Sequence, residues 1–221
     1  MREKERLQKI IEALDMEYED IGCALVYDKP YELLMATRLS AQCTDVRVNI
    51  VTKELFEKYP TLLSIAAAPV EDIMAVVRPC GFYRVKAQNI VDMANILLTK
   101  YNGVVPDTIE ELIKLPGVGR KTANLIVGDI YGKPAIVTDT HCIRISNKLG
   151  LCNTKDPFKV EMALKKILPE SRSGQICHQL VWHGRRYCIA RRPKCDVCPL
   201  YTLCPAGGYI GKDAKKKEKR M

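Results

Sequence analysis

Long apolar runs are missing from this 221-residue sequence. No stretch approaches the ~20 consecutive apolar residues that a membrane-spanning helix needs, and charged residues make up 28% of the chain. The first six residues carry alternating charges and no apolar core, so no secretory signal is predicted. A membrane-spanning or exported protein is therefore not expected.

Alternating, strand-like patterns are also almost absent. Only residues 24–27 and 135–138 look like short β-strands, and no internal repeat is present. Apolar residues recur instead at helical spacing, and four such faces lie in residues 7–14, 70–77, 90–97 and 160–167. The pattern predicts an all-α protein of roughly ten helices, separated by proline and glycine stops.

Positive charge is concentrated in two short segments. The chain has 35 basic and 26 acidic residues, a formal net charge of +9. Residues 185–204 carry a net charge of +4, and so do residues 212–221, where lysine predominates. This concentration favours contact with a polyanion, and nucleic acid before a membrane, because no strong basic amphipathic helix accompanies it. A solvated basic surface is the alternative, above all for the C-terminal lysines.

The ten cysteines fall into two groups. Six are scattered in apolar contexts and are predicted to be ordinary buried thiols, namely Cys23, Cys43, Cys80, Cys142, Cys152 and Cys177. The other four have the spacing C-x6-C-x2-C-x5-C, and they are Cys188, Cys195, Cys198 and Cys204. Four thiolates within seventeen residues suit a metal site, and this spacing alone does not separate zinc from iron.

Residues 109–131 predict two helices joined by a tight turn. Pro116 ends the first helix, while Gly117 and Gly119 permit positive φ and expose backbone before a second helix begins near Arg120. The inward face of that second helix is expected to carry Thr122, Leu125 and Ile126. Free amides and the helix dipole at its start form an anion site. A plain turn would also use these glycines, but the basic residues that follow favour a phosphate contact.

Lys121 and Asp139 are the candidate reactive residues. The helix dipole and Arg120 both disfavour a positive charge on Lys121, and a neutral amine is a nucleophile. Such an amine could displace a base at the sugar C1′ and form an imine that acidifies the C2′ protons. Asp139, which begins a later helix, could take a proton or stabilise an oxocarbenium-like sugar. The residues alone leave plainer roles open, a phosphate contact for Lys121 and an N-cap for Asp139.

Four segments together resemble the endonuclease III family of DNA glycosylases. They are Leu115–Ala123, Val137–His141, Leu39–Asp45 and the cysteine group at 188–204. The resemblance covers about residues 5–205, nearly the whole chain. It implies that Lys121 is the catalytic nucleophile with Asp139 as its partner. It also implies that Cys188, Cys195, Cys198 and Cys204 hold a [4Fe–4S] cluster, which would be structural and would fold a basic loop onto DNA.

The resemblance further implies a set of DNA contacts. Chemistry at C1′ requires the nucleotide to be flipped out, and the gap must then be filled. Gln42 corresponds to the glutamine that enters the gap, and Phe82 stands where the family usually has a leucine wedge. The remaining expected contacts are Gly117, Gly119, Arg120, His141, Arg191, Arg192 and Lys194. A core position for Phe82, a buried amide for Gln42 and a structural hydrogen bond for His141 are the alternatives.

The residues at two positions indicate which branch of the family this sequence resembles. Adenine-removing relatives often carry serine at the position of Lys121 and use a glutamate near residues 34–38. This chain has the lysine and no glutamate between Leu33 and Asp45. The resemblance therefore implies a bifunctional enzyme that removes damaged pyrimidines and cleaves the strand. Alternatives are a glycosylase for mismatched thymine or uracil, and a non-catalytic DNA-binding module stabilised by a metal.

The expected architecture has two helical lobes with a cleft between them, across which Lys121 and Asp139 would face each other. One lobe of about six helices spans residues 23–134 and includes the helix–hairpin–helix at about 109–131. The other combines residues 1–22 with 135–221, including the cluster loop and the basic tail. We expect a cytoplasmic, nucleoid-associated monomer whose partner is double-stranded DNA with damaged bases or abasic sites.

Overall fold

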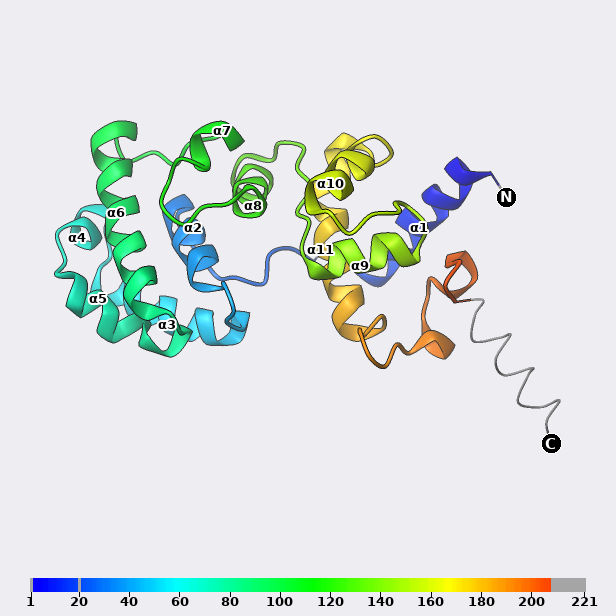
Figure 1. The fold of residues 1–221 in the computed structure, drawn as a ribbon, viewed down its shortest axis with the longest axis horizontal. Coiled ribbons are helices and arrows are strands. Elements are labelled where there is room, and N and C mark those ends of the chain that lie inside the picture. Colours follow the sequence, from blue (N-terminus) through cyan, green and yellow to red (C-terminus); the bar gives the residue numbers. More distant parts are fainter. Residues whose placement is uncertain (1, 20, 208–221) are drawn as a thin grey trace. The chain divides into compact units, whose positions relative to one another are not determined.

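The computed structural model of the protein describes residues 2–19 and 21–207, and this part of the chain is helical (Figure 1). Its described residues form eleven α-helices and four 3₁₀ turns, with no strand among them. The all-α prediction is confirmed. The strand-like segments 24–27 and 135–138 are irregular, because no strand of the described chain lies beside them for pairing. No helix in the described ranges is long and apolar enough to cross a bilayer.

Contacts divide the chain into two compact units, residues 23–133 and residues 1–22 with 134–221. The helices of the first unit are α2 (Pro30–Leu39), α3 (Asp45–Lys58), α4 (Leu62–Ala66), α5 (Val70–Val77), η1 (Arg78–Cys80), α6 (Tyr83–Tyr101), α7 (Ile109–Leu112) and α8 (Arg120–Tyr131). Those of the second are α1 (Glu3–Glu17), α9 (Thr140–Lys148), α10 (Pro157–Lys165), η2 (Glu170–Arg172), α11 (Ser173–Arg186), η3 (Cys195–Val197) and η4 (Tyr201–Leu203).

Helix α6 is the central element of the first unit. It packs against α4, α5 and α2, while α2 also packs against α8 and α3. The apolar face predicted for residues 90–97 is fully buried. The helix ends where Asn102 takes a left-handed conformation and the Gly103 amide donates to the Leu97 carbonyl at 2.8 Å. Threonine side chains cap α3, α4 and α7, so three of the seven α-helices of this unit have starts that are fixed locally.

Helix α11 is the corresponding element of the second unit, and it packs against α9 and α1. Asp15 on α1 binds Arg172 at 2.5 Å and accepts from Gln179 at 3.0 Å. Arg6 donates to the carbonyls of Leu149 at 2.6 Å and Leu203 at 3.2 Å. These bonds join the N-terminal helix to the segment that follows residue 134.

Two local predictions are wrong. The buried face of α8 consists of Ala123, Asn124, Ile126 and Val127, whereas the expected Thr122 and Leu125 are only half-buried. Helical spacing fixes the period of a face but not its phase, which here is set by packing against α2 and α7. Among the six scattered cysteines, Cys23, Cys43 and Cys152 are half-buried because they lie in turns and loops outside the helices.

Candidate active site and metal centre

The turn between α7 and α8 is built around one left-handed glycine. The Val118 amide donates to the Leu115 carbonyl at 3.1 Å, and Gly117 has a φ of +75°. Gly119 has a φ of −96°, so the expectation that both glycines use their conformational freedom holds only for Gly117. Gly119 serves instead as the N-cap residue of α8.

Side chains from α2 and α6 support this turn. Arg38 Nε donates to Asn89 Oδ1 at 2.8 Å. A Cβ atom at Gly117 would lie 2.6 Å from Arg38 Cδ and 2.7 Å from Asn89 Oδ1. Gly117 is therefore required twice, once for its positive φ and once for the space beside Arg38. Sequence reasoning missed Arg38 and Asn89, because nothing in their local pattern indicates that they converge on residue 117.

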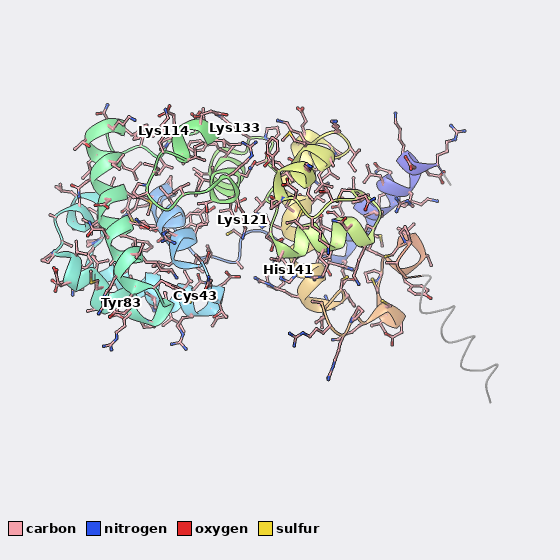
Figure 2. The ribbon with its side chains drawn as sticks, viewed as in Figure 1. Cys43, Tyr83, Lys114, Lys121, Lys133 and His141 are labelled. Carbon is pink, nitrogen blue, oxygen red and sulfur yellow. The ribbon has the colours of Figure 1, made fainter. Side chains whose placement is uncertain are left out.

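Lys121 is the second residue of α8 and is exposed. The start of this helix has no side-chain cap. Its first backbone amides therefore have no capping side chain to accept their hydrogen bonds. Figure 2 labels Lys121 together with Lys114 and Lys133 in the same unit. Lys114 pairs with Glu111 and Lys133 pairs with Asp107 at 2.5 Å, whereas Lys121 makes no ion pair within the described chain. Its amine is available to an incoming ligand.

Asp139 lies in the other unit and is the N-cap residue of α9. Its Oδ1 accepts from the Cys142 amide at 2.6 Å. The carboxylate is half-buried and follows residues 135–138, which are buried and lead into the helix. Asp139 thus has the N-cap role that the sequence analysis gave as an alternative. The same hydrogen bond fixes the direction of its carboxylate.

His141 is the second residue of the same helix, and its imidazole is held by neighbouring side chains. Its Nδ1 lies 3.3 Å from Arg144 Nη2, which donates to the Cys188 carbonyl at 2.7 Å. The imidazole also lies against Gly184 of α11, where a Cβ would overlap the ring. A structural contact for His141 is therefore present, and it connects α9 to the start of the cysteine loop.

Gln42 and Phe82 are both exposed and both left-handed. Gln42 has a φ of +57° and Phe82 a φ of +48°, and 68% of the Phe82 side chain is exposed. The buried alternatives for these two residues are wrong. A left-handed conformation is costly for residues other than glycine and is often found at functional sites. Both residues belong to the first unit, Gln42 in the turn that follows α2 and Phe82 at the N-cap of α6.

The four clustered cysteines line one cavity in the second unit. Cys188, Cys195, Cys198 and Cys204 surround a space of about 40 Å³, together with His183, Tyr187 and other side chains. That space is several times what one water molecule needs. Burial raises the pKa of the Cys188 and Cys198 thiols, so their thiolates need a positive partner.

The arrangement of the four thiols around this cavity is compatible with a multi-iron cluster. No three His, Cys, Asp or Glu side chains of the described residues converge closely enough to hold a single metal ion. A tetrahedral zinc draws its four sulfurs to about 2.3 Å from one point. A cluster carries a separate iron atom for each thiolate, and it therefore accepts sulfurs that surround a cavity without converging on one point.

The basic residues expected to contact DNA lie on the surface of this cysteine loop. Arg191, Arg192 and Lys194 are exposed between the first two cysteines, and the Lys194 amide donates to the Tyr187 carbonyl at 2.9 Å. That backbone bond ties the loop to the end of α11. The basic tail at residues 212–221 lies outside the described residues.

The comparisons with known proteins define the class of the protein first. The family model described as "HhH-GPD superfamily base excision DNA repair protein" matches residues 35–170. A second model, the "Iron-sulfur binding domain of endonuclease III", matches residues 188–204, which contain the four cysteines. The helical fold, the turn before α8 and the cysteine loop are thus those of a helix–hairpin–helix repair protein with an iron–sulfur domain.

The relatives narrow this class. Endonuclease III of Bacillus subtilis (strain 168) is 45% identical over 186 residues, which cover 84% of this chain and 85% of that protein. The structure of a non-covalent endonuclease III–DNA complex is similar with a TM-score of 0.89 and 44% identity, covering 96% of this chain and all of that one. A trapped endonuclease III–DNA covalent intermediate has a TM-score of 0.88 at the same identity, over 95% of this chain and 99% of that one. The chain belongs to the endonuclease III family, and its cofactor is a [4Fe–4S] cluster.

Proposed function

We propose that this protein is a DNA N-glycosylase with abasic-site lyase activity, which removes oxidised or damaged pyrimidines from duplex DNA in base excision repair. The observation that carries this proposal is the start of α8, where an exposed lysine with no ion pair in the described chain adjoins uncapped amides. The amides suit a phosphate and the amine suits the adjacent sugar carbon. The family of the chain supports the same chemistry.

In the proposed reaction, the neutral amine of Lys121 attacks C1′ of the flipped nucleotide. A bond forms between nitrogen and C1′, and the bond from C1′ to the base breaks, with the electron pair leaving on the base. Ring opening then gives an imine, which acidifies the protons on C2′. Loss of one C2′ proton expels the 3′ phosphate by β-elimination, and water releases the lysine. Each step uses only Lys121, a proton acceptor and water.

Asp139 takes the second role. Its carboxylate is fixed by the bond from the Cys142 amide, so it can oppose positive charge without first rotating. It accepts a proton from the attacking amine or stabilises the sugar as positive charge develops at C1′. Lys121 and Asp139 lie in different units, and each is placed only within its own.

DNA is held by contacts from both units in this proposal. The turn at Gly117 and Gly119, with Arg120, takes a phosphate. Gln42 and Phe82 enter the duplex at the flipped nucleotide, consistent with their exposure. His141 lines the pocket, and the exposed Arg191, Arg192 and Lys194 contact the backbone of the duplex.

Cys188, Cys195, Cys198 and Cys204 would hold the [4Fe–4S] cluster, whose contribution is to fold the basic loop and not to supply redox turnover. The exposed loop then presents its arginines to DNA. We further propose that the protein works as a monomer in the cytoplasm, associated with the nucleoid through DNA.

A panel of lesion-bearing oligonucleotides tests the function, with separate readouts for base release and strand cleavage. Damaged pyrimidines should be released and the strand cut by β-elimination, and borohydride should trap a covalent protein–DNA adduct. Lys121→Ala and Lys121→Gln should abolish the adduct while duplex binding persists, because the turn amides remain. Lys114→Ala is the matched control, since that lysine is already paired with Glu111.

Each contrary outcome has a distinct meaning. Undiminished trapping by Lys121→Ala would move the nucleophile elsewhere. Preferred release of mismatched thymine or uracil would favour the neighbouring glycosylase. Binding without any turnover on the whole panel would leave only a DNA-binding module.

A further inference from the structure

Lys86 on α6 is the largest fully buried side chain of the described residues and is only 1% exposed. A lysine in this position is unusual, because removing an ammonium group from water is costly unless it is fully hydrogen-bonded. Burial lowers the pKa of Lys86. The function proposed above assigns nothing to this residue.

The ammonium group is satisfied by three main-chain carbonyls. Lys86 Nζ donates to Leu39 O, Ala41 O and Cys80 O, each at 2.8 Å. An ammonium has three donors and no acceptor, so three carbonyl oxygens match the charged form, and a neutral amine would leave one oxygen without a donor. No carboxylate of residues 2–19 or 21–207 takes part in this arrangement.

Those carbonyls belong to the two segments that carry the left-handed residues. Ala41 O is part of the peptide bond that leads into Gln42, and Cys80 O lies two residues before Phe82. The Lys86 amide also donates to the Phe82 carbonyl at 3.1 Å. Figure 2 labels Cys43 and Tyr83, the residues that follow Gln42 and Phe82 on these segments. Lys86 thus holds both segments from one point.

Further contacts join the same segments but do not replace this one. The Cys43 and Cys80 thiols are close enough to interact electrostatically, and the Cys43 amide donates to the Ser40 carbonyl at 3.0 Å. Among the described residues, the Lys86 side chain alone donates hydrogen bonds to the end of α2, the turn after it and the end of η1 together. Exposed left-handed residues persist where their surroundings hold them in place.

We propose that Lys86 is a positioning residue that sets the places of Gln42 and Phe82 relative to each other, so that both enter the same gap in the duplex. This inference rests on the proposed insertion of these two residues. It predicts that Lys86 contributes to the opening of the duplex and little to the chemistry at an abasic site.

The test compares Lys86→Met with wild-type protein in single-turnover assays. Methionine keeps the shape of the side chain and removes its three donors. The rate of damaged-base release should fall roughly 10²-fold, since small displacements of positioned groups cost that much. Cleavage of a pre-formed abasic site should fall far less, because little unstacking is needed there. In duplexes with 2-aminopurine opposite an abasic site, the fluorescence rise on binding should also be reduced.

Leu97→Ala is the matched control, because Leu97 is fully buried on the same helix and far along it from both segments. It should lower stability without changing the ratio of base release to abasic-site cleavage. In a Gln42→Ala/Phe82→Ala background, Lys86→Met should cause no further loss of that ratio. If Lys86→Met fails to fold, Lys86→Gln, which keeps two donors on a shorter side chain, should give the same pattern with a smaller loss.

Equal losses on both substrates, or a further loss in the double-variant background, would overturn the inference and leave Lys86 as a core residue. Wild-type protein that releases no damaged base would overturn the proposed function instead. The 2-aminopurine signal on abasic DNA would then decide the inference, with an unchanged signal in Lys86→Met counting against it.

Discussion

Asp139 caps α9 and is also the proposed partner of Lys121, and one substitution separates these roles. Asparagine caps helices about as well as aspartate, so Asp139→Asn should keep the bond from the Cys142 amide and the melting temperature. Loss of the negative charge should slow base release about 10²-fold or more. Borohydride trapping at an abasic site should suffer less, because the abasic aldehyde needs no oxocarbenium stabilisation.

Asp156→Asn is the control for this prediction. Asp156 caps α10 with the same geometry, its Oδ1 accepting from the Lys159 amide at 2.8 Å, and it has no proposed role in the reaction. It should leave both rates unchanged. Wild-type base release by Asp139→Asn would reduce Asp139 to a helix cap.

Gly117 is a second residue at which a small substitution should have a large effect, here on the stability of the protein. In Gly117→Ala the alanine would have to adopt the left-handed backbone conformation of position 117. Its Cβ would also overlap the side chains of Arg38 and Asn89. The free energy of unfolding should fall by about 2 kcal/mol or more, measured by urea denaturation. Gly174→Ala is the control, because that glycine lies in α11 with nothing within 4 Å and should be neutral or stabilising. Equal stability of the two variants would contradict the close packing of the turn.

At the scale of elements, we expect the cysteine loop to depend on its cluster more than on regular structure. Its only helical pieces are the short turns η3 and η4. Purified protein should be brown and contain about four iron atoms per chain. Cys198→Ser should lose iron and weaken DNA binding, whereas Cys152→Ser, at a thiol outside the cavity, should do neither. Stoichiometric zinc without iron in anaerobically prepared protein would exclude the cluster.

At the scale of the whole molecule, the net positive charge is concentrated in two short segments. Eight of the nine net positive charges belong to residues 185–204 and 212–221. Changing Arg191 and Arg192 together to alanine should weaken binding to all duplexes alike. The slope of log K against log salt should fall by up to about two units, because each phosphate contact contributes about 0.9. Lys165→Ala/Lys166→Ala removes equal charge elsewhere in the unit and should leave the slope unchanged.

An unchanged slope in the Arg191→Ala/Arg192→Ala protein would make the loop a solvated surface. Equal reductions in both double variants would indicate that only the net charge of the molecule matters. The comparison therefore separates a local contact from a general attraction to DNA.

The sequence by itself determined the helical class, the turn before α8 and the grouping of four cysteines. These features are local: apolar spacing sets a helix, proline and glycine set a turn, and cysteine spacing sets a candidate metal site. Even the capping role of Asp139 was visible as an alternative, because it depends on residues three positions apart.

Only the tertiary structure decided which face of α8 is buried, that Phe82 is exposed, and that Arg38 and Asn89 support Gly117. The same holds for Lys86. Read along α6 it is a lysine like any other, and its burial depends on carbonyls up to 47 residues away in the chain. A hydrogen bond between distant residues leaves no periodic trace in sequence, because each partner is an ordinary backbone group until the fold brings it within reach.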